Sequence, residues 1–481
     1  MVGKEAAASA EDLTPPAGDD GDTPEGLVRS SAAMAVGTAL SRLTGFLRVA
    51  AMAFALGVAE SRLADSYNVA NNIPNIVYEL VLGGILTSVF VPVFVTQFTR
   101  RSRTEALSSA SAVMTVVVVV LGGITIAGIL GAPWIVKLYT FRVPGPQRAQ
   151  VQELAGFFLR FFMPQIFLYG MGAVATGLLN THRRFAAPMF APILNNAIVI
   201  ATFMTFAVMP GPAEPVPGAI TSAQRLVLAI GTTAGVVVMT FALWPTLRRI
   251  GFRWRWRLEW RNEAVRELIS LSGWAVLYVV LNQLGLLVVI VLAGGVQGGY
   301  TAYQAAFIFF QLPYAIFSVS IMTALHPSLS ADWARGDRAD FRQDLARGVR
   351  ASAFVVLPAA AGYLVLAEPI VRLLLQHGVA GAGSTALVSG VLTFFAIGLF
   401  PFSAFLLFLR AFYAMKDTRT PALINAVSVA VNTGANLILF PLLGVRGLAL
   451  GHAIAYAVAA TTAAVVLRRR LDGLEGRAVL R

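Results

Sequence analysis

The stretch Thr38–Pro92 decides the fold. It reads TALSRLTGFLRVAAMAFALG (38–57), then a short polar break, then NVANNIPNIVYELVLGGILTSVFVP (68–92). Each half is long and apolar enough to cross a bilayer, which requires about 20 residues. Charged residues nevertheless lie within or beside both halves: Arg42, Arg48, Asp65 and Glu79. A charge at membrane depth is costly, so such residues normally face a polar interior and mark a functional site.

Two arginines of the first half share one helix. Arg42 and Arg48 are six positions apart, which is about 120° around a helix and about 9 Å along it. Both side chains are therefore expected on one broad cavity wall, where they suit a large anionic head group better than a single small ion. The alternative interpretation is that they reach toward the membrane interface or pair with a carboxylate inside the bundle.

The composition indicates a polytopic membrane protein. Of 481 residues, 57% are hydrophobic and 13% are charged, whereas soluble domains average about 45–50% and about 25%. The net charge of +13 comes from cations in short loops, so the positive-inside rule explains it better than nucleic-acid binding. The chain has no cysteine and four scattered histidines, which excludes disulfides and thiolate metal sites and predicts no metal site.

Hydropathy predicts twelve membrane spans, with both termini in the cytoplasm. We expect the spans near 31–57, 66–97, 107–138, 152–180, 185–209, 222–247, 264–294, 301–329, 346–376, 385–415, 420–442 and 445–470. The loops alternate between cation-rich and cation-poor, and the positive-inside rule places the cation-rich set in the cytoplasm. The even number of spans agrees with that assignment.

The termini and the centre of the chain suggest a domain organisation. Residues 1–28 are acidic and rich in Ala, Pro and Gly, so we expect a disordered cytoplasmic tail. We expect an N-lobe at 29–247, a C-lobe at 264–470 and a cytoplasmic C-terminal segment at 471–481. Between the lobes, 248–263 contains RRIGFRWRWRLEWR, which predicts an interfacial linker with Trp at the headgroups and Arg toward anionic phospholipids.

The two halves of the chain show an internal repeat. LLNTHRRFAAPMFAPILNNA (178–197) and AFYAMKDTRTPALINAVSVA (411–430) each end a span, cross a basic loop and enter the next span through a proline, 233 residues apart. NNIPNIVYEL (71–80) is similarly echoed by FFQLPYAIFS (309–318). Six spans separate each pair, so the halves share one orientation, as in transporters with parallel repeats and a substrate site at their interface. Chance similarity between apolar segments is the alternative.

Several motifs resemble those of the MurJ/MviN family, proposed flippases of the peptidoglycan precursor lipid II. The matching stretches are SRLTGFLR (41–48), the Asp65 region, TSVFVPVF (87–94), GLLNTHRRFAAPMFAPILNN (177–196), EPIVRLLLQHG (368–378) and FYAMKDTRTP (412–421). Their details are most similar to actinobacterial members. The resemblance implies an all-α, MATE-like transporter of the MOP superfamily, with two six-helix lobes in a V around a cationic cavity. It also implies a role in cell-wall synthesis and cell shape, and a location in the inner or plasma membrane of a bacterial cell.

The resemblance implies a substrate site. The family's diphosphate-binding arginines of the first span match Arg42 and Arg48, and an acidic residue at the start of span 2 matches Asp65. We extend the candidate set to Arg160, which lies in an apolar run of span 4. Asn75 and Glu79 of span 2 complete the set. An ion pair between Glu79 and Arg48 or Arg160 would instead be structural.

The sequence also departs from the family pattern. Many members carry arginines in spans 2 and 8, but the matching positions here hold Tyr78 and Glu79, and no cation lies near Ile308. Some members bind sodium through carboxylates of the second lobe. The apolar parts of spans 7, 11 and 12 here offer no acid and instead contain asparagines: Asn282, Asn425, Asn432 and Asn436. The family usually has fourteen spans, so we expect either a longer natural chain or a member without the groove for the lipid tail.

No catalytic constellation or Walker motif is present, so we expect a transporter that is not an enzyme and needs no cofactor. The first hypothesis is a flippase that moves lipid II outward by alternating access, driven by membrane potential. The second is a MATE-like exporter or a flippase of another lipid-linked glycan, although a cation exporter would require buried acids. The third is a non-transporting scaffold that docks cell-wall synthesis proteins.

Overall fold

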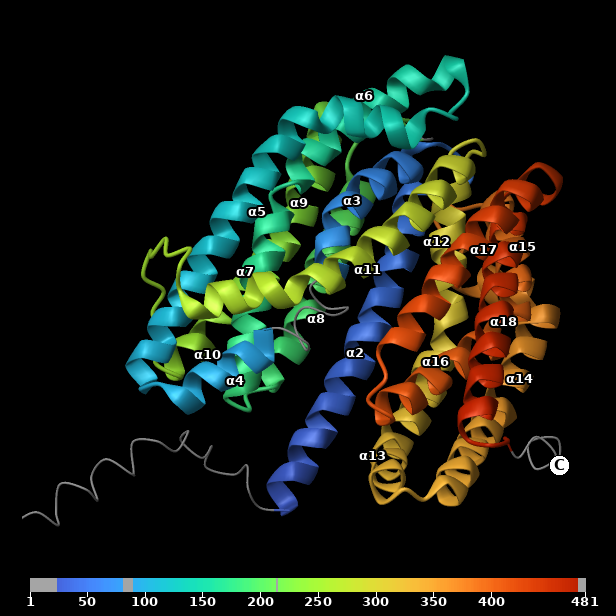
Figure 1. The fold of residues 1–481 in the computed structure, drawn as a ribbon. Helices are drawn as coiled ribbons and strands as arrows, with labels where there is room; N and C mark the ends of the chain where they lie inside the picture. Colours follow the sequence, from blue (N-terminus) through green and yellow to red (C-terminus); the bar gives the residue numbers. More distant parts are fainter. Residues whose placement is uncertain (1–23, 81–89, 213–214, 475–481) are drawn as a thin grey trace, which may run out of the picture. The chain divides into compact units, whose positions relative to one another are not determined.

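The computed structural model describes residues 24–80, 90–212 and 215–474, and within these ranges all regular structure is helical (Figure 1). The prediction of an all-α chain is confirmed. In chain order the elements are α2 (Pro24–Leu56), α3 (Leu63–Leu80), α4 (Val91–Arg100), α5 (Arg103–Thr140), α6 (Gly145–Phe162), α7 (Gln165–Thr181), α8 (Ala186–Val208), α9 (Ser222–Phe241), α10 (Trp244–Arg249), α11 (Glu263–Ala293), α12 (Gly299–Pro313), the π-helical turn η3 (Tyr314–Ser318), α13 (Val319–Arg335), α14 (Arg338–Leu375), α15 (Ala382–Ile397), α16 (Leu399–Ala414), α17 (Arg419–Leu443) and α18 (Val445–Arg470).

Most of the predicted spans are confirmed. Among the described residues, nine helices are long and apolar enough to cross a membrane, and α15 with α16, which meet at a 50° bend, form a tenth span. Two of the twelve predicted spans are not among these ten. The span at 66–97 includes 81–89, which lie outside the described residues, and the span at 264–294 coincides with α11. The helix that carries the first span begins at Pro24, so residues 24–28 are helical and the prediction of a disordered tail is wrong for them. The part of α2 that is apolar enough to cross a membrane is Ala39–Leu56.

The chain forms two compact units. Unit 1 consists of Met1–Ala55, Ser66–Leu138 and Ala149–Val280, and unit 2 consists of Leu56–Asp65, Tyr139–Arg148 and Leu281–Arg481. The predicted linker at 248–263 therefore lies within unit 1. Two short loops from the first half of the sequence belong to unit 2, which hydropathy alone did not indicate.

The same helix-ending turn occurs in both units, at the places the repeat predicts. Arg183 after α7 has φ 55° and Lys416 after α16 has φ 58°. The next amide closes each turn, from Arg184 N to Leu179 O and from Asp417 N to Phe412 O, both at 2.9 Å. This is a Schellman motif, and a cation there also interacts favourably with the helix C-terminus. The shared offset of 233 residues supports the internal repeat.

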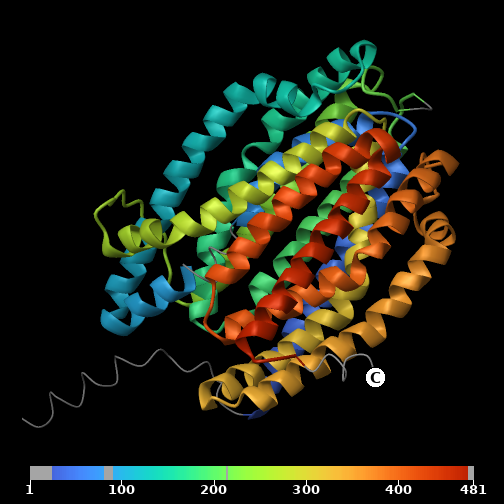
Figure 2. The same cartoon turned by 45° about the vertical axis from the view of Figure 1, so that its right-hand side comes forward.

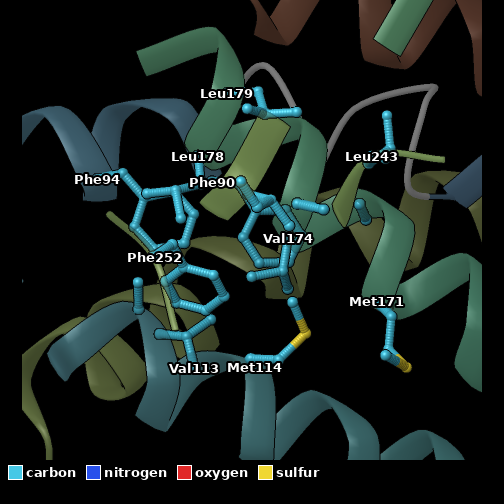
Figure 3. Packing of buried hydrophobic residues seen from close by; sticks show 14 of the residues in the cluster. Phe90, Phe94, Val113, Met114, Met171, Val174, Leu178, Leu179, Leu243 and Phe252 are labelled. Atoms are coloured by element: carbon cyan, nitrogen blue, oxygen red, sulfur yellow. The ribbon is translucent and has the colours of Figure 1, made fainter. Parts of the chain in front are cut away.

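Each unit has its own apolar core. In unit 1 the core joins α4, α5 and α7 with the segment after α10, through side chains such as Phe94, Met114, Leu178 and Phe252 (Figure 3). In unit 2, α13, α14, α16 and α18 share a second core, and α17 lies beside α18 (Figures 1 and 2). Of the helices that carry candidate site residues, α3 packs against the core of unit 1 through Tyr78.

Candidate functional site

A stripe of small residues sets the orientation of α2. Gly37, Ser41 and Gly45 recur every four residues on the face that packs against α8. A Cβ added to Gly37 would lie 3.1 Å from an α8 side chain, and Asn196 of α8 donates a hydrogen bond to Oγ1 of Thr44 (3.0 Å). Small residues at this spacing let membrane helices approach closely, so the packing determines which way the neighbouring arginines point.

The packing of α2 against α8 explains why Arg48 and Arg42 differ in burial. Arg48 comes seven residues after Ser41, about 20° away around the helix, so it lies near the packed face. Its side chain is half-buried, whereas Arg42, about 100° from Ser41, is exposed. Neither guanidinium makes a hydrogen bond or an ion pair with another residue that the structure describes. Arg48 is thus a half-buried cation that no described carboxylate neutralises.

Three tyrosine side chains of unit 1 lie within electrostatic reach of Arg48: Tyr67, Tyr78 and Tyr169. The rings of Tyr78 and Tyr169 are 4.8 Å apart. The Tyr169 hydroxyl donates to Oδ1 of Asn75 (3.0 Å). The structure therefore brings two predicted site residues, Arg48 and Asn75, to one cluster of phenols, which we call the tyrosine cluster.

The tyrosine cluster borders an apolar pocket within unit 1. Helices α3, α7, α8 and α9 contribute to it, and its lining consists of Tyr78, Tyr169, Gly172, Ala173, Thr176, Pro188, Ala191, Pro192, Met239, Thr240 and Leu243. An apolar pocket beside phenol hydroxyls and a cation has the character expected of a site for an amphiphilic ligand. Sequence reasoning missed Tyr67 and Tyr169. Tyr67 and Tyr78 are eleven residues apart on α3, which places them about 20° apart on one helix face.

Arg160 and Asp65 make no hydrogen bond or ion pair with the tyrosine cluster within the described part of the chain. Arg160 is exposed in the last turn of α6. Glu79 is exposed on α3 and interacts with a neighbour. Asp65 belongs to unit 2. Roles for these residues in substrate binding stay predictions.

Asp65 caps a helix of unit 2. Its side chain is 5% exposed. Oδ2 accepts a hydrogen bond from Gly298 N (2.8 Å), and Oδ1 accepts from Thr301 N (3.0 Å) and Thr301 Oγ1 (2.8 Å). These donors lie at the start of α12, where the positive end of the helix dipole favours an anion. Both carboxylate oxygens therefore serve a structural contact within unit 2.

Glu60 makes the equivalent contact with α15. Oε1 accepts from Gly381 N (2.7 Å), and Oε2 accepts from Ser384 Oγ (2.5 Å) and Val58 N (2.8 Å). Burial alone would raise the pKa of Glu60, but the hydrogen bonds from the Ser384 hydroxyl and the Gly381 and Val58 amides outweigh it and lower the pKa. The ionised carboxylate is therefore part of the folded state.

Arg62, in contrast, lies at the C-terminus of a helix. It donates to Gly294 O (2.9 Å), just after α11, and to Oε1 of Gln147 (2.5 Å). A cation is favoured at a helix C-terminus. The segment Leu56–Asp65 thus carries three charges, each at a helix end of unit 2 and each with the favourable sign. Sequence reasoning did not single out Arg62 for this role, because the partners of the segment lie far along the chain.

The capping by Glu60 leads to a pH-dependent prediction. Replacing Glu60 with Gln should destabilise the protein by about 1–2 kcal/mol at pH 7, because the cap loses its charge and one of its acceptors. A lowered folded-state pKa contributes stability above the ordinary value of 4.5, and this stability is lost as pH falls through the folded-state pKa. The difference in Tm between wild type and Glu60→Gln should therefore shrink below pH 4.5. A constant difference from pH 7 to pH 3 would contradict this assignment.

Comparison with known proteins places these features in a family. A family profile described as "Lipid II flippase MurJ" matches residues 52–481. The chain is 31% identical over 429 residues to "Probable lipid II flippase MurJ" of Rhizobium meliloti, with 89% of this chain and 78% of the relative covered. It is 27% identical over 440 residues to "Lipid II flippase MurJ" of Burkholderia cenocepacia, with 90% and 82% covered.

Solved structures share the fold. One titled "Lipid II flippase MurJ, inward closed conformation" superposes with a TM-score of 0.77 at 21% identity and covers 93% of this chain and 89% of that one. An inward-facing multidrug resistance MATE family transporter of the MOP superfamily superposes with a TM-score of 0.69 at 15% identity, with 90% and 98% covered. At these identities the structural matches establish the fold, and the prediction of a MATE-like fold is confirmed.

Proposed function

Because the chain belongs to the MurJ family of lipid II flippases, we propose that it moves lipid II from the cytoplasmic to the outer leaflet, with Arg48 binding the diphosphate. Lipid II is an undecaprenyl diphosphate that carries a disaccharide-pentapeptide. The ligand therefore combines a strong anion, a polar head and a long apolar tail. A flippase for it has to lower the cost of bringing the anion to membrane depth.

The observation that carries the proposal is the half-buried guanidinium of Arg48 in a membrane helix, without an ion pair to any described residue. A guanidinium presents paired N–H donors that match phosphate oxygens. The tyrosine cluster adds phenol hydroxyls beside it. Arg42, exposed on the same helix, is suited to the first encounter with the head group, and the adjacent apolar pocket suits a nonpolar part of the ligand.

In this proposal the protein transports lipid II by alternating access. Relatives of the same fold are titled as inward-facing and outward-facing conformations. A diphosphate with two negative charges that moves outward across 100 mV, inside negative, gains about 4–5 kcal/mol, so the membrane potential favours export. The protein acts as a transporter and not as an enzyme in this proposal. Its termini lie in the cytoplasm, and cell-wall synthesis proteins and anionic phospholipids are its further partners.

Depletion of the protein in a wall-synthesising cell tests the function. Lipid II should accumulate where an externally added lipid II-cleaving enzyme cannot reach it, and re-expression of the wild-type chain should restore access. Undiminished cleavage from outside, in a strain that lacks any related flippase, would rule out the proposal. Loss of drug efflux with unchanged lipid II access would instead favour the exporter alternative.

A further inference from the structure

The segment between α10 and α11 has a regular two-sided pattern. Residues 252–260 read FRWRWRLEW and form neither a helix nor a strand. Apolar residues occupy the even positions, and arginines or Glu259 occupy the odd ones. Phe252 is buried and Trp254 is half-buried, whereas Arg253 and Arg255 are exposed. We therefore call the even positions the aromatic side and the odd positions the charged side. We call Ile250–Arg261 the cationic strap.

The cationic strap is attached to the start of α5. Trp254 Nε1 and the amide of Arg257 both donate to Oγ1 of Thr115, each at 3.1 Å. The Arg257 side chain also donates to Ser108 Oγ (2.9 Å). Phe252 is 2% exposed and joins the core of unit 1. Figures 1 and 2 both show this segment beside α5, so the strap has a defined position.

The second half of the aromatic side is left uncovered. Trp256 is 63% exposed, Leu258 is 48% exposed and Trp260 is 47% exposed. The Trp254 end packs against the core of unit 1, where its ring lies 6.3 Å from that of Trp244. Tryptophan combines an apolar body with one polar N–H, and it concentrates at the headgroup level of membranes.

The charged side is rich in unneutralised arginine. The acids nearest the strap are already paired, Glu259 with Arg257 (3.5 Å) and Glu263 with Arg101 (2.5 Å). Five exposed arginines in the strap or just before it have guanidinium groups that make no hydrogen bond or ion pair with any other described residue: Arg248, Arg249, Arg253, Arg255 and Arg261. Phosphate is the anion that guanidinium groups bind best through paired hydrogen bonds.

The position of the strap along α5 matches the membrane interface. α5 has 38 residues and is about 57 Å long, whereas the hydrocarbon core is about 30 Å thick. The helix must therefore extend beyond the hydrocarbon. The strap contacts Ser108 and Thr115, and the uninterrupted apolar run of α5 begins at the next residue, Val116.

We propose that the cationic strap binds the headgroups of anionic phospholipids, with the unneutralised arginines on the phosphates and with Trp256 and Trp260 inserted between the lipids. A soluble polyanion would match the arginines but would leave both tryptophans and Leu258 in water. The combination therefore favours a lipid over a nucleic acid. This inference does not depend on the flippase function.

The test uses the full-length protein in phosphatidylcholine nanodiscs that contain either brominated phosphatidylglycerol or brominated phosphatidylcholine. Brominated phosphatidylglycerol should quench the tryptophan fluorescence more strongly, and Trp256→Phe with Trp260→Phe should remove most of this difference. The triple variant Arg253→Gln, Arg255→Gln and Arg261→Gln should lower the apparent affinity for phosphatidylglycerol by about tenfold or more, since each cation near the surface contributes to binding. High salt should weaken the wild-type preference.

The matched control is Arg335→Gln, Arg338→Gln and Arg347→Gln, which removes three arginines that are paired with acids. It should retain the phosphatidylglycerol preference, and both triple variants should keep the wild-type Tm in phosphatidylcholine. Equal quenching by the two brominated lipids, or equal losses in the two triple variants, would overturn the proposal. Tighter binding of a soluble DNA duplex than of phosphatidylglycerol would also overturn it.

Discussion

Replacing Arg48 with alanine is expected to weaken lipid II binding by about 30-fold or more, because truncating a desolvated charge that holds an anion costs about 2–5 kcal/mol. Arg48 is half-buried beside the tyrosine cluster, where less water competes for the phosphate than at the surface. The loss should be seen in direct binding of lipid II to purified protein. It should also abolish complementation of a depleted strain.

Three comparisons make the Arg48 result specific. Arg48→Lys keeps the charge but loses the paired donor geometry, so it should retain part of the affinity. Arg42→Ala should weaken lipid II binding less than Arg48→Ala does, because Arg42 is exposed and a solvated charge contributes little to binding. Arg347→Ala removes an exposed arginine paired with Asp344 and should bind as wild type does. An Arg48→Ala protein with wild-type affinity would remove the basis for diphosphate binding at this site.

Replacing Asp65 with alanine is expected to cause a large loss of stability, about 3 kcal/mol or more, because it leaves buried donors without an acceptor. Three donors are affected, the amides of Gly298 and Thr301 and the Thr301 hydroxyl. Thermal unfolding of the purified protein would measure the effect as a fall in Tm. Asp65→Asn should lose less stability than Asp65→Ala, since one oxygen remains and only one donor would face the new NH₂ group.

The matched control for Asp65 is Asp337→Ala. Asp337 caps α14 through the amides of Ala339 and Asp340, but these hydrogen bonds are exposed to solvent. Water can replace its contacts, so the loss should be close to that of an ordinary N-cap, about 1 kcal/mol. Equal Tm shifts for Asp65→Ala and Asp337→Ala would show that burial of the Asp65 cap adds nothing to its contribution to stability.

Much of the fold could be predicted because its signals are local. Apolar run length predicted ten spans that the described residues confirm. The basic loops with their following prolines predicted the repeat, and the left-handed Arg183 and Lys416 support it. Arg48 could likewise be singled out, since a charge within an apolar run is visible in the sequence itself.

The candidate site was less predictable because it depends on helix packing. The sequence presented Arg42 and Arg48 as a pair on one wall, and their difference in burial arises from the contact between α2 and α8. The cluster around Arg48 also needs Tyr169, which is 121 positions further along the chain. No local pattern indicates which side chains meet over such a separation.

By itself, the sequence determined that this is an all-α membrane protein with a duplicated plan and an arginine inside its first span. It could do so because hydropathy, helix period and turn chemistry depend on neighbouring residues. Only the tertiary structure decided which arginine is half-buried beside the tyrosine cluster and that Glu60, Arg62 and Asp65 cap helices of unit 2. Those assignments depend on donors and acceptors that lie up to 324 residues away in the chain, and packing alone brings such groups within hydrogen-bonding distance.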